Sequence, residues 1–334
     1  MQRRPDRNWL AWWLAVLILC LGPALHAVKT ARINGIDYVS LSEVGGSLGM
    51  EAQWLKRGER LRLKSQWTTM EYTINRRDFT LNGTAINLGW PIAPSKGDLY
   101  MSEVDYEKTL QPVLTPQVFK DVPKLYRIVI DPGHGGKDPG AQNTGLKLNE
   151  KDAVLDVAKR LQKLLAAQGY DVVLTRDSDV YLPLSTRSSK ANDAGADLFI
   201  SLHFNAVGSS SVQGMETYVF TAQNMPSSSR GSLHSSDRRT YAGNRSDTWN
   251  MLAGYYVQRA MTEKTKATDR GVKRARFTVL RDLNMPGMLI EGGFVTSSRE
   301  GPKIASASYR QDLAEAIADG VITYQRTLNR LRGR

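Results

Sequence analysis

The chain has 334 residues, of which 41% are hydrophobic, so it can bury the core of one large domain or two ordinary ones. Its formal net charge of +12 favours polyanionic neighbours such as nucleic acid, anionic lipid or an acidic cell-wall polymer. Lysines and arginines are scattered rather than gathered into a dense run interleaved with aromatic residues, which argues against a nucleic-acid-binding protein.

Residues 1–27 have the pattern of a secretory signal. Three arginines precede an apolar run from Trp9 to Leu21, which is short for a membrane span of about 20 residues. Small residues follow, so we expect cleavage after Ala24 or Ala27, with an uncleaved membrane anchor as the alternative. The sequence thus predicts an exported protein of the periplasm, cell envelope or extracellular space that touches the membrane only through this segment.

The only cysteine, Cys20, lies inside the predicted signal. The remaining chain has no thiol for a disulfide, a nucleophile or a metal ligand. Any metal site in the exported protein must therefore use histidine, aspartate and glutamate.

Residues 30–114 predict a small, β-rich α+β module, because short β-like runs alternate with turns such as Asn34-Gly35 and Asn82-Gly83. The two Asn-Gly turns, Tyr38-Val39, Gly49 and Trp54 resemble the copper amine oxidase N-terminal-like domain, although the stretch has no histidine or cysteine for copper. Wall binding, by this or another β-rich module, and a structural spacer are the alternatives for its role. The expected strands are 37–41, 60–64, 69–74, 78–81 and 99–102, with a short helix at 41–48.

A proline-containing linker is expected at 115–125. From residue 126 to 331 strand and helix patterns alternate, which predicts an α/β domain with a layered open mixed sheet flanked by helices. We expect strands at 126–130, 171–175, 198–202, 215–220, 277–280 and 288–290, helices at 150–168, 184–194, 250–266 and 309–331, and a surface loop at 221–248.

Four polar residues stand at or near strand ends of this predicted sheet: His134, Glu150, His203 and Glu291. Two histidines and one glutamate are the ligand set of many catalytic zinc sites, and a further carboxylate is what a hydrolase needs as general base. Each residue alone also has a structural explanation, such as the favourable helix dipole for Glu150 or an arginine partner for Glu291. The pattern therefore predicts a zinc site.

Four segments in order carry a specific resemblance: Ile130–Ala141, Asn149–Lys151, Ser201–Ala206 and Leu289–Phe294. Together they resemble the zinc-dependent N-acetylmuramoyl-L-alanine amidases of family 3 over about residues 126–328. The resemblance implies that His134, Glu150 and His203 bind one zinc ion and that Glu291 is the catalytic carboxylate. Asn205 and Arg187 are weaker candidates for contacts with the substrate or with the metal ligands.

The resemblance implies a peptidoglycan hydrolase that cleaves the amide between N-acetylmuramic acid and the L-alanine of the stem peptide. The alternatives are a zinc peptidase or carboxypeptidase acting within the stem peptide, and a non-catalytic wall-binding protein.

Two departures from the family pattern carry expectations. Phe204 stands where relatives often have alanine, and is expected to narrow the cleft beside the metal. Some relatives carry a long helical insertion that blocks the site. The corresponding stretch here, residues 221–248, is short and poorly helical, so such inhibition is not expected and a protein activator is not indicated.

Overall fold

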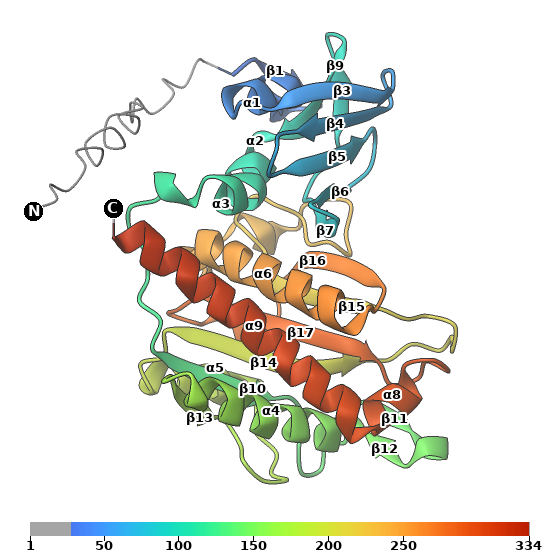
Figure 1. Cartoon of the computed structure of the whole chain (residues 1–334), viewed down its shortest axis with the longest axis vertical. Coiled ribbons are helices and arrows are strands. Elements are labelled where there is room, and N and C mark those ends of the chain that lie inside the picture. The colour runs from blue at the N-terminus through green and yellow to red at the C-terminus, as the bar shows by residue number, and fades with distance from the viewer. Residues whose placement is uncertain (1–27, 334) are drawn as a thin grey trace, which may run out of the picture.

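The computed structural model describes residues 28–333, so the predicted signal at residues 1–27 lies outside the described part. A β-rich region formed by the first third of the chain stands next to a larger layered α/β region (Figure 1). Among the described residues, no helix combines the length and the apolar character that crossing a membrane requires.

One 11-stranded sheet runs through both regions, in the order β13-β10-β14-β17-β15-β16-β7-β6-β5-β4-β3. Strands β13, β10, β14 and β17 are parallel, while β15 is antiparallel to β17. The predicted mixed sheet flanked by helices is thereby confirmed. In the larger region the strands are β10 (Arg127–Pro132), β13 (Asp171–Leu174), β14 (Leu198–Asn205), β15 (Met215–Phe220), β16 (Asp269–Ala275) and β17 (Gly287–Phe294).

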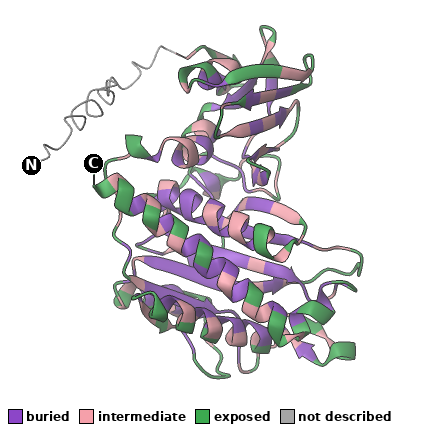
Figure 2. Ribbon diagram, viewed as in Figure 1, coloured by how far each residue is buried: buried purple, intermediate pink, exposed green. Residues whose placement is uncertain are grey.

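Helices cover both faces of this part of the sheet. One face packs against α4 (Glu150–Ala167), α6 (Asp247–Thr265) and α9 (Ala307–Arg332), and the other against α5 (Leu184–Asp193) and α7 (Thr278–Arg281). Strand side chains alternate between the two cores, since Leu202 belongs to the first and Phe199 to the second. Figure 2 shows the buried strands between helices whose outer sides are exposed.

The β-rich region combines a meander with a smaller sheet. The meander consists of β3 (Glu51–Lys56), β4 (Arg60–Lys64), β5 (Thr69–Thr73), β6 (Asp78–Leu81) and β7 (Thr84–Asn87). The four-stranded sheet contains β1 (Thr30–Ile33), β2 (Ile36–Ser40), β9 (Asp98–Ser102) and β8 (Ala93–Ser95), with α1 (Leu41–Ser47) packed nearby. Helical turns α2 (Glu103–Asp105), η1 (Tyr106–Leu110) and α3 (Gln111–Leu114) follow.

The two regions join through strand β16, which lies between β15 and β7 in the sheet. Val272 pairs with Ile86 of β7, and the Asp269 carboxylate accepts a hydrogen bond of 2.7 Å from the Ala85 amide. The buried guanidinium of Arg274 donates to the Lys108 carbonyl of η1. The division into residues 30–114, a linker at 115–125 and a second domain stays a prediction. Residues 116–118 of that linker form one 3-10 helix, η2.

The strand expected at 277–280 is wrong, because Thr278–Arg281 form α7. The strand of this region is β16, just before it, which the sequence analysis missed. Charged residues and Gly271 make β16 look like a loop, yet its backbone pairs with β15 on one side and β7 on the other. The loop at 221–248 also contains two 3-10 helices, η4 (Ser235–Arg238) and η5 (Ala242–Ser246).

Candidate active site

The loop after β10 carries His134 in an unusual backbone conformation. Its φ is 58°, in the left-handed region that side-chain-bearing residues seldom adopt. Two buried arginines hold the loop: Arg176 donates to the Pro132 and Gly133 carbonyls at 2.9 and 2.7 Å, and Arg187 donates to the His134 carbonyl at 2.7 Å. These hydrogen bonds pair the carbonyls of the loop and hold its backbone in place.

Asp131, at the end of β10, holds the start of the His134 loop in place. Its fully buried carboxylate accepts hydrogen bonds from Thr175 Oγ1 at 2.5 Å and from Ser201 Oγ and Arg187 Nη1 at 2.9 Å each. A buried charge is tolerated when it is paired and hydrogen-bonded in this way. The network ties β10, β14 and the residue that follows β13 (Asp171–Leu174) to the position of His134.

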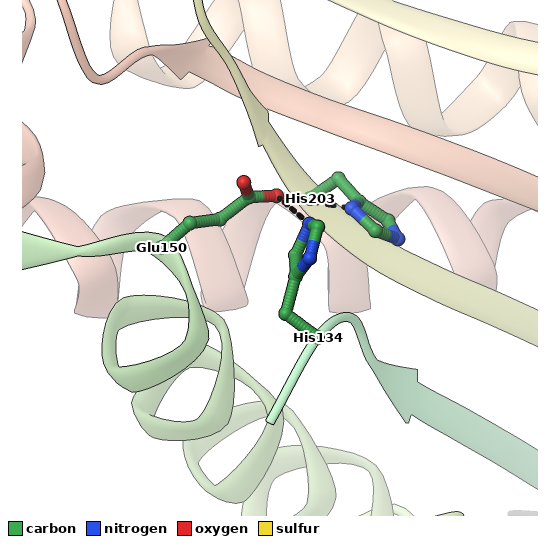
Figure 3. Close-up of side chains that lie close together, drawn as sticks. All are labelled: His134, Glu150 and His203. Carbon is green, nitrogen blue, oxygen red and sulfur yellow. Dashed lines mark hydrogen bonds and ion pairs between the residues drawn. The ribbon is translucent and has the colours of Figure 1, made fainter. Parts of the chain in front are cut away.

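His134, Glu150 and His203 converge from three different elements, as Figure 3 shows. His134 Nε2 and His203 Nδ1 each lie 3.0 Å from the same oxygen, Glu150 Oε1. One ligand atom from each residue lies within 4.8 Å of the other two. His134 Nδ1 is paired with Asp138 Oδ2 at 2.9 Å, the kind of partner that orients a metal-binding imidazole.

The Glu150 carboxylate is fixed at the start of α4. Its two oxygens accept hydrogen bonds from the backbone amides of Phe204 at 3.0 Å and Ala141 at 2.7 Å. Burial acts to raise the pKa of Glu150, but the hydrogen bonds and charges of His134 and His203 hold it below its ordinary value. Glu150 is therefore an anion facing two imidazoles, a donor set that fits a zinc ion.

Glycines leave the space that the imidazole rings occupy. A Cβ at Gly133 would lie 2.3 Å from His203 Cε1, and a Cβ at Gly140 would lie 2.6 Å from Glu150 Oε2 and 2.7 Å from His134 Cδ2. Contacts this short do not occur between real side chains. The glycines of the loop are therefore required by the cluster itself.

Glu291 stands directly beside His203, because the two residues are partners in the register of the parallel strands β14 and β17. Its Oε2 is buried and has no hydrogen-bond partner among residues 28–333. Burial, followed by the negative charges of Glu150 and Glu216, raises the pKa of Glu291 well above its ordinary value. A carboxylate in this environment takes up a proton readily, as a general base must.

The two weaker candidates lie in different surroundings. Asn205 donates to Glu216 Oε1 at 2.8 Å on the same sheet face as His203. Arg187 is only 3% exposed and is occupied by Asp131 and by backbone carbonyls. Arg187 therefore supports the His134 loop from within the protein and is not available to a substrate.

The expectation for Phe204 is wrong. Its side chain points to the opposite face of β14, where it packs in the core with Leu313 of α9, because successive strand residues alternate between faces. Phe204 therefore does not narrow a cleft beside His203.

Sequence reasoning missed Glu216 on β15, which is the register partner of Glu291. Its side chain accepts hydrogen bonds from Asn205, Tyr218, Arg270 and Lys273. A carboxylate inside the largely apolar strand Met215–Phe220 was the signal that could have identified it. The supporting contacts of Asp138 and Arg176 with the histidine loop were not predicted either.

Comparison with known proteins gives a consistent result. Residues 128–323 match the family described as N-acetylmuramoyl-L-alanine amidase. The chain is 37% identical over 199 residues to the N-acetylmuramoyl-L-alanine amidase LytC of Bacillus subtilis, covering 60% of this chain and 35% of LytC. It is 33% identical over 226 residues to AmiC of Neisseria meningitidis, covering 62% of this chain and 54% of AmiC.

Among solved structures, an N-acetylmuramoyl-L-alanine amidase of Clostridium difficile matches with a TM-score of 0.51 and 34% identity, covering 61% of this chain and 98% of that structure. The chain spans about a third to a half of the length of the two curated relatives, at 35% and 54%. The family match begins at residue 128, so the resemblance predicted for residues 30–114 stays a prediction.

Proposed function

We infer that this chain, which belongs to the N-acetylmuramoyl-L-alanine amidase family, hydrolyses the amide between N-acetylmuramic acid and the L-alanine of a peptidoglycan stem peptide. The observation that carries the proposal is the convergence of His134, Glu150 and His203 with Glu291 in register beside them. Peptidoglycan is the proposed partner, and the formal net charge of +12 suits an anionic wall.

His134, Glu150 and His203 would hold one zinc ion, the first through Nε2 and the last through Nδ1, the atoms that face Glu150. Zinc bound there would supply Lewis-acid polarisation of the scissile carbonyl and of the attacking water. Asp138 would keep the His134 ring in place through its contact with Nδ1. The buried arginines beneath the loop would preserve this geometry through the reaction.

Glu291 would act as the general base. We propose that its carboxylate accepts a proton from the attacking water and then delivers that proton to the nitrogen of the departing L-alanine, so that the carbon–nitrogen bond breaks. Its buried oxygen without a partner among the described residues supports this role, since that oxygen is free to receive the proton. The carboxylate is held by β17, a central strand of the sheet.

We also propose export to the periplasm or cell envelope, where peptidoglycan lies, and a wall-binding role for residues 30–114. Trp67, at the β4–β5 turn, is 80% exposed, and exposed aromatic rings are frequent anchors in binding surfaces. Cosedimentation with purified sacculi tests this role. Trp67→Ala should weaken binding, and unchanged binding would leave the region as a spacer.

The proposed chemistry is tested with a matched pair of variants. Glu291→Gln should keep about one zinc per chain and lose nearly all activity on purified peptidoglycan, because the amide cannot accept the proton. Glu263→Gln removes an exposed carboxylate of α6 and should retain wild-type activity. Full activity of Glu291→Gln would overturn the assigned base, whereas loss of zinc from it would place Glu291 among the ligands.

A further inference from the structure

A row of charged side chains extends from the metal-binding cluster along one face of the sheet. His203 is the register partner of Glu291, and Glu291 is the register partner of Glu216 on β15. Glu216 in turn bonds to two cations of the next strand, Arg270 and Lys273 of β16. The proposed chemistry uses only the first part of this row.

The end of the row carries excess positive charge. The Glu216 carboxylate is shared by Arg270 Nε at 2.8 Å and by Lys273 Nζ, so one anion faces two cations. Two other carboxylates close by are committed elsewhere. Asp269 accepts from Gln258 and the backbone amides of Ala85 and Gly271, and Glu300 accepts from the amides of Gly214 and Phe294. Glu216, Arg270 and Lys273 therefore carry one positive charge more than they balance among themselves. Among the described residues, the Glu291 carboxylate, next in the row, forms no ion pair with either cation.

The Arg270 guanidinium is held in one orientation, yet some of its N–H groups have no hydrogen-bond acceptor among the described residues. It lies over the Phe294 ring with its central carbon 5.1 Å from the ring centroid, and its Nε is held by Glu216. Its side chain is 34% exposed, and within residues 28–333 its two terminal nitrogens make no hydrogen bond. A planar guanidinium fixed in this way is suited to two parallel bonds with a carboxylate.

We propose that Arg270, supported by Lys273, forms a subsite for a carboxylate of the stem peptide. β15 lies one strand spacing from β17, or about 5 Å, and the Arg270 side chain extends back from β16 to Glu216 on β15. An extended peptide covers about 7 Å in two residues. An acidic residue next to the first alanine therefore reaches Arg270 when the scissile amide lies beside Glu291. The subsite rests on the proposed function and adds a specificity to it: stem peptides with a free carboxylate there are preferred over amidated ones.

The test uses the zinc-loaded full chain and two soluble muropeptides that differ only at the residue after alanine, which is D-glutamate in one and D-isoglutamine in the other. Wild-type protein should favour the free carboxylate by at least about tenfold in kcat/KM, mainly through KM, since hydrogen bonds to a charged group are stronger than neutral ones. Arg270→Gln should lose this preference. Arg259→Gln, which removes an exposed arginine of α6 paired with Glu263, should keep it.

The outcomes separate the two proposals. Cleavage of neither muropeptide by wild-type protein overturns the proposed function, and the subsite with it. Cleavage of both at equal efficiency, or a preference that survives in folded Arg270→Gln, overturns the subsite alone. Thermal unfolding shows whether Arg270→Gln is folded. If it is not, the ratio of kcat/KM for the two muropeptides in the wild-type protein decides whether the subsite exists.

Discussion

A Cβ atom at Gly133 would lie 2.3 Å from Cε1 of His203, so the ring of this histidine occupies space that only a glycine leaves open. Gly133→Ala should therefore displace the ring and reduce bound zinc to well below one ion per chain, as measured by elemental analysis of dialysed protein. Gly145→Ala is the matched control, because its nearest neighbour would be 3.6 Å away. Stoichiometric zinc in Gly133→Ala would contradict the observed packing.

Arg187 is expected to determine stability more than substrate recognition. Arg187→Ala leaves the Asp131 carboxylate buried without its cation, and breaking a buried pair from one side costs about 3–5 kcal/mol. Urea unfolding should show a loss of that size. Arg239→Ala, on the exposed loop before η5, should change stability by less than about 0.5 kcal/mol. A similarly small effect for Arg187→Ala would refute the anchoring role.

Asp156 gives a pH-dependent link between α4 and α9. Burial acts to raise the pKa of Asp156, but its bonds to Arg160 and Arg310 lower it below the ordinary value of 3.8. A depressed folded-state pKa stabilises the protein above pH 3.8, and this stabilisation is lost as the pH falls through the folded-state pKa.

The stability difference between wild type and Asp156→Asn should therefore be full near neutral pH and disappear in strong acid. Denaturant midpoints at several pH values measure it. A difference that does not change from neutral to strongly acidic pH would show that packing, rather than charge, is responsible.

Metal removal should affect stability as well as activity. Zinc that binds only the folded state adds about 2.7 kcal/mol at 100 times its dissociation constant, so a chelator should lower the unfolding temperature and zinc should restore it. His134→Ala lacks one of the three proposed ligands, so its unfolding temperature should respond little to chelator. An equal response in both proteins would place the metal elsewhere.

The sequence was sufficient to predict that His134, Glu150 and His203 converge, because they lie in or next to elements with strong apolar patterns. β10 is a buried run that ends in a glycine-rich turn, and β14 is a buried run with His203 near its end. The helix from Glu150 has a clear apolar face. The alternation of strands and helices predicted that these elements meet at one edge of the sheet. That both histidines contact the same oxygen, Glu150 Oε1, could not be inferred from sequence spacing.

β16 could not be recognised, because four of its seven residues are charged and no alternation of apolar and polar residues remains. Because β16 was not recognised as a strand, the ion pair between Glu216 and Arg270 could not be predicted either. The pairing of Ile86 with Val272, which joins the two regions, could not be predicted either. A single residue pair 186 positions apart leaves no periodic pattern in the sequence. Local patterns predicted the layers, while the register between distant strands required the structure.

Mass spectrometry of the products from purified peptidoglycan is the most direct test of the central claim. The account predicts glycan strands with unsubstituted lactyl groups and intact stem peptides that begin at L-alanine, formed by zinc-loaded protein and absent in the presence of chelator. Stem peptides cut internally would identify a peptidase, and no soluble product from zinc-loaded protein would contradict the assignment of hydrolytic activity.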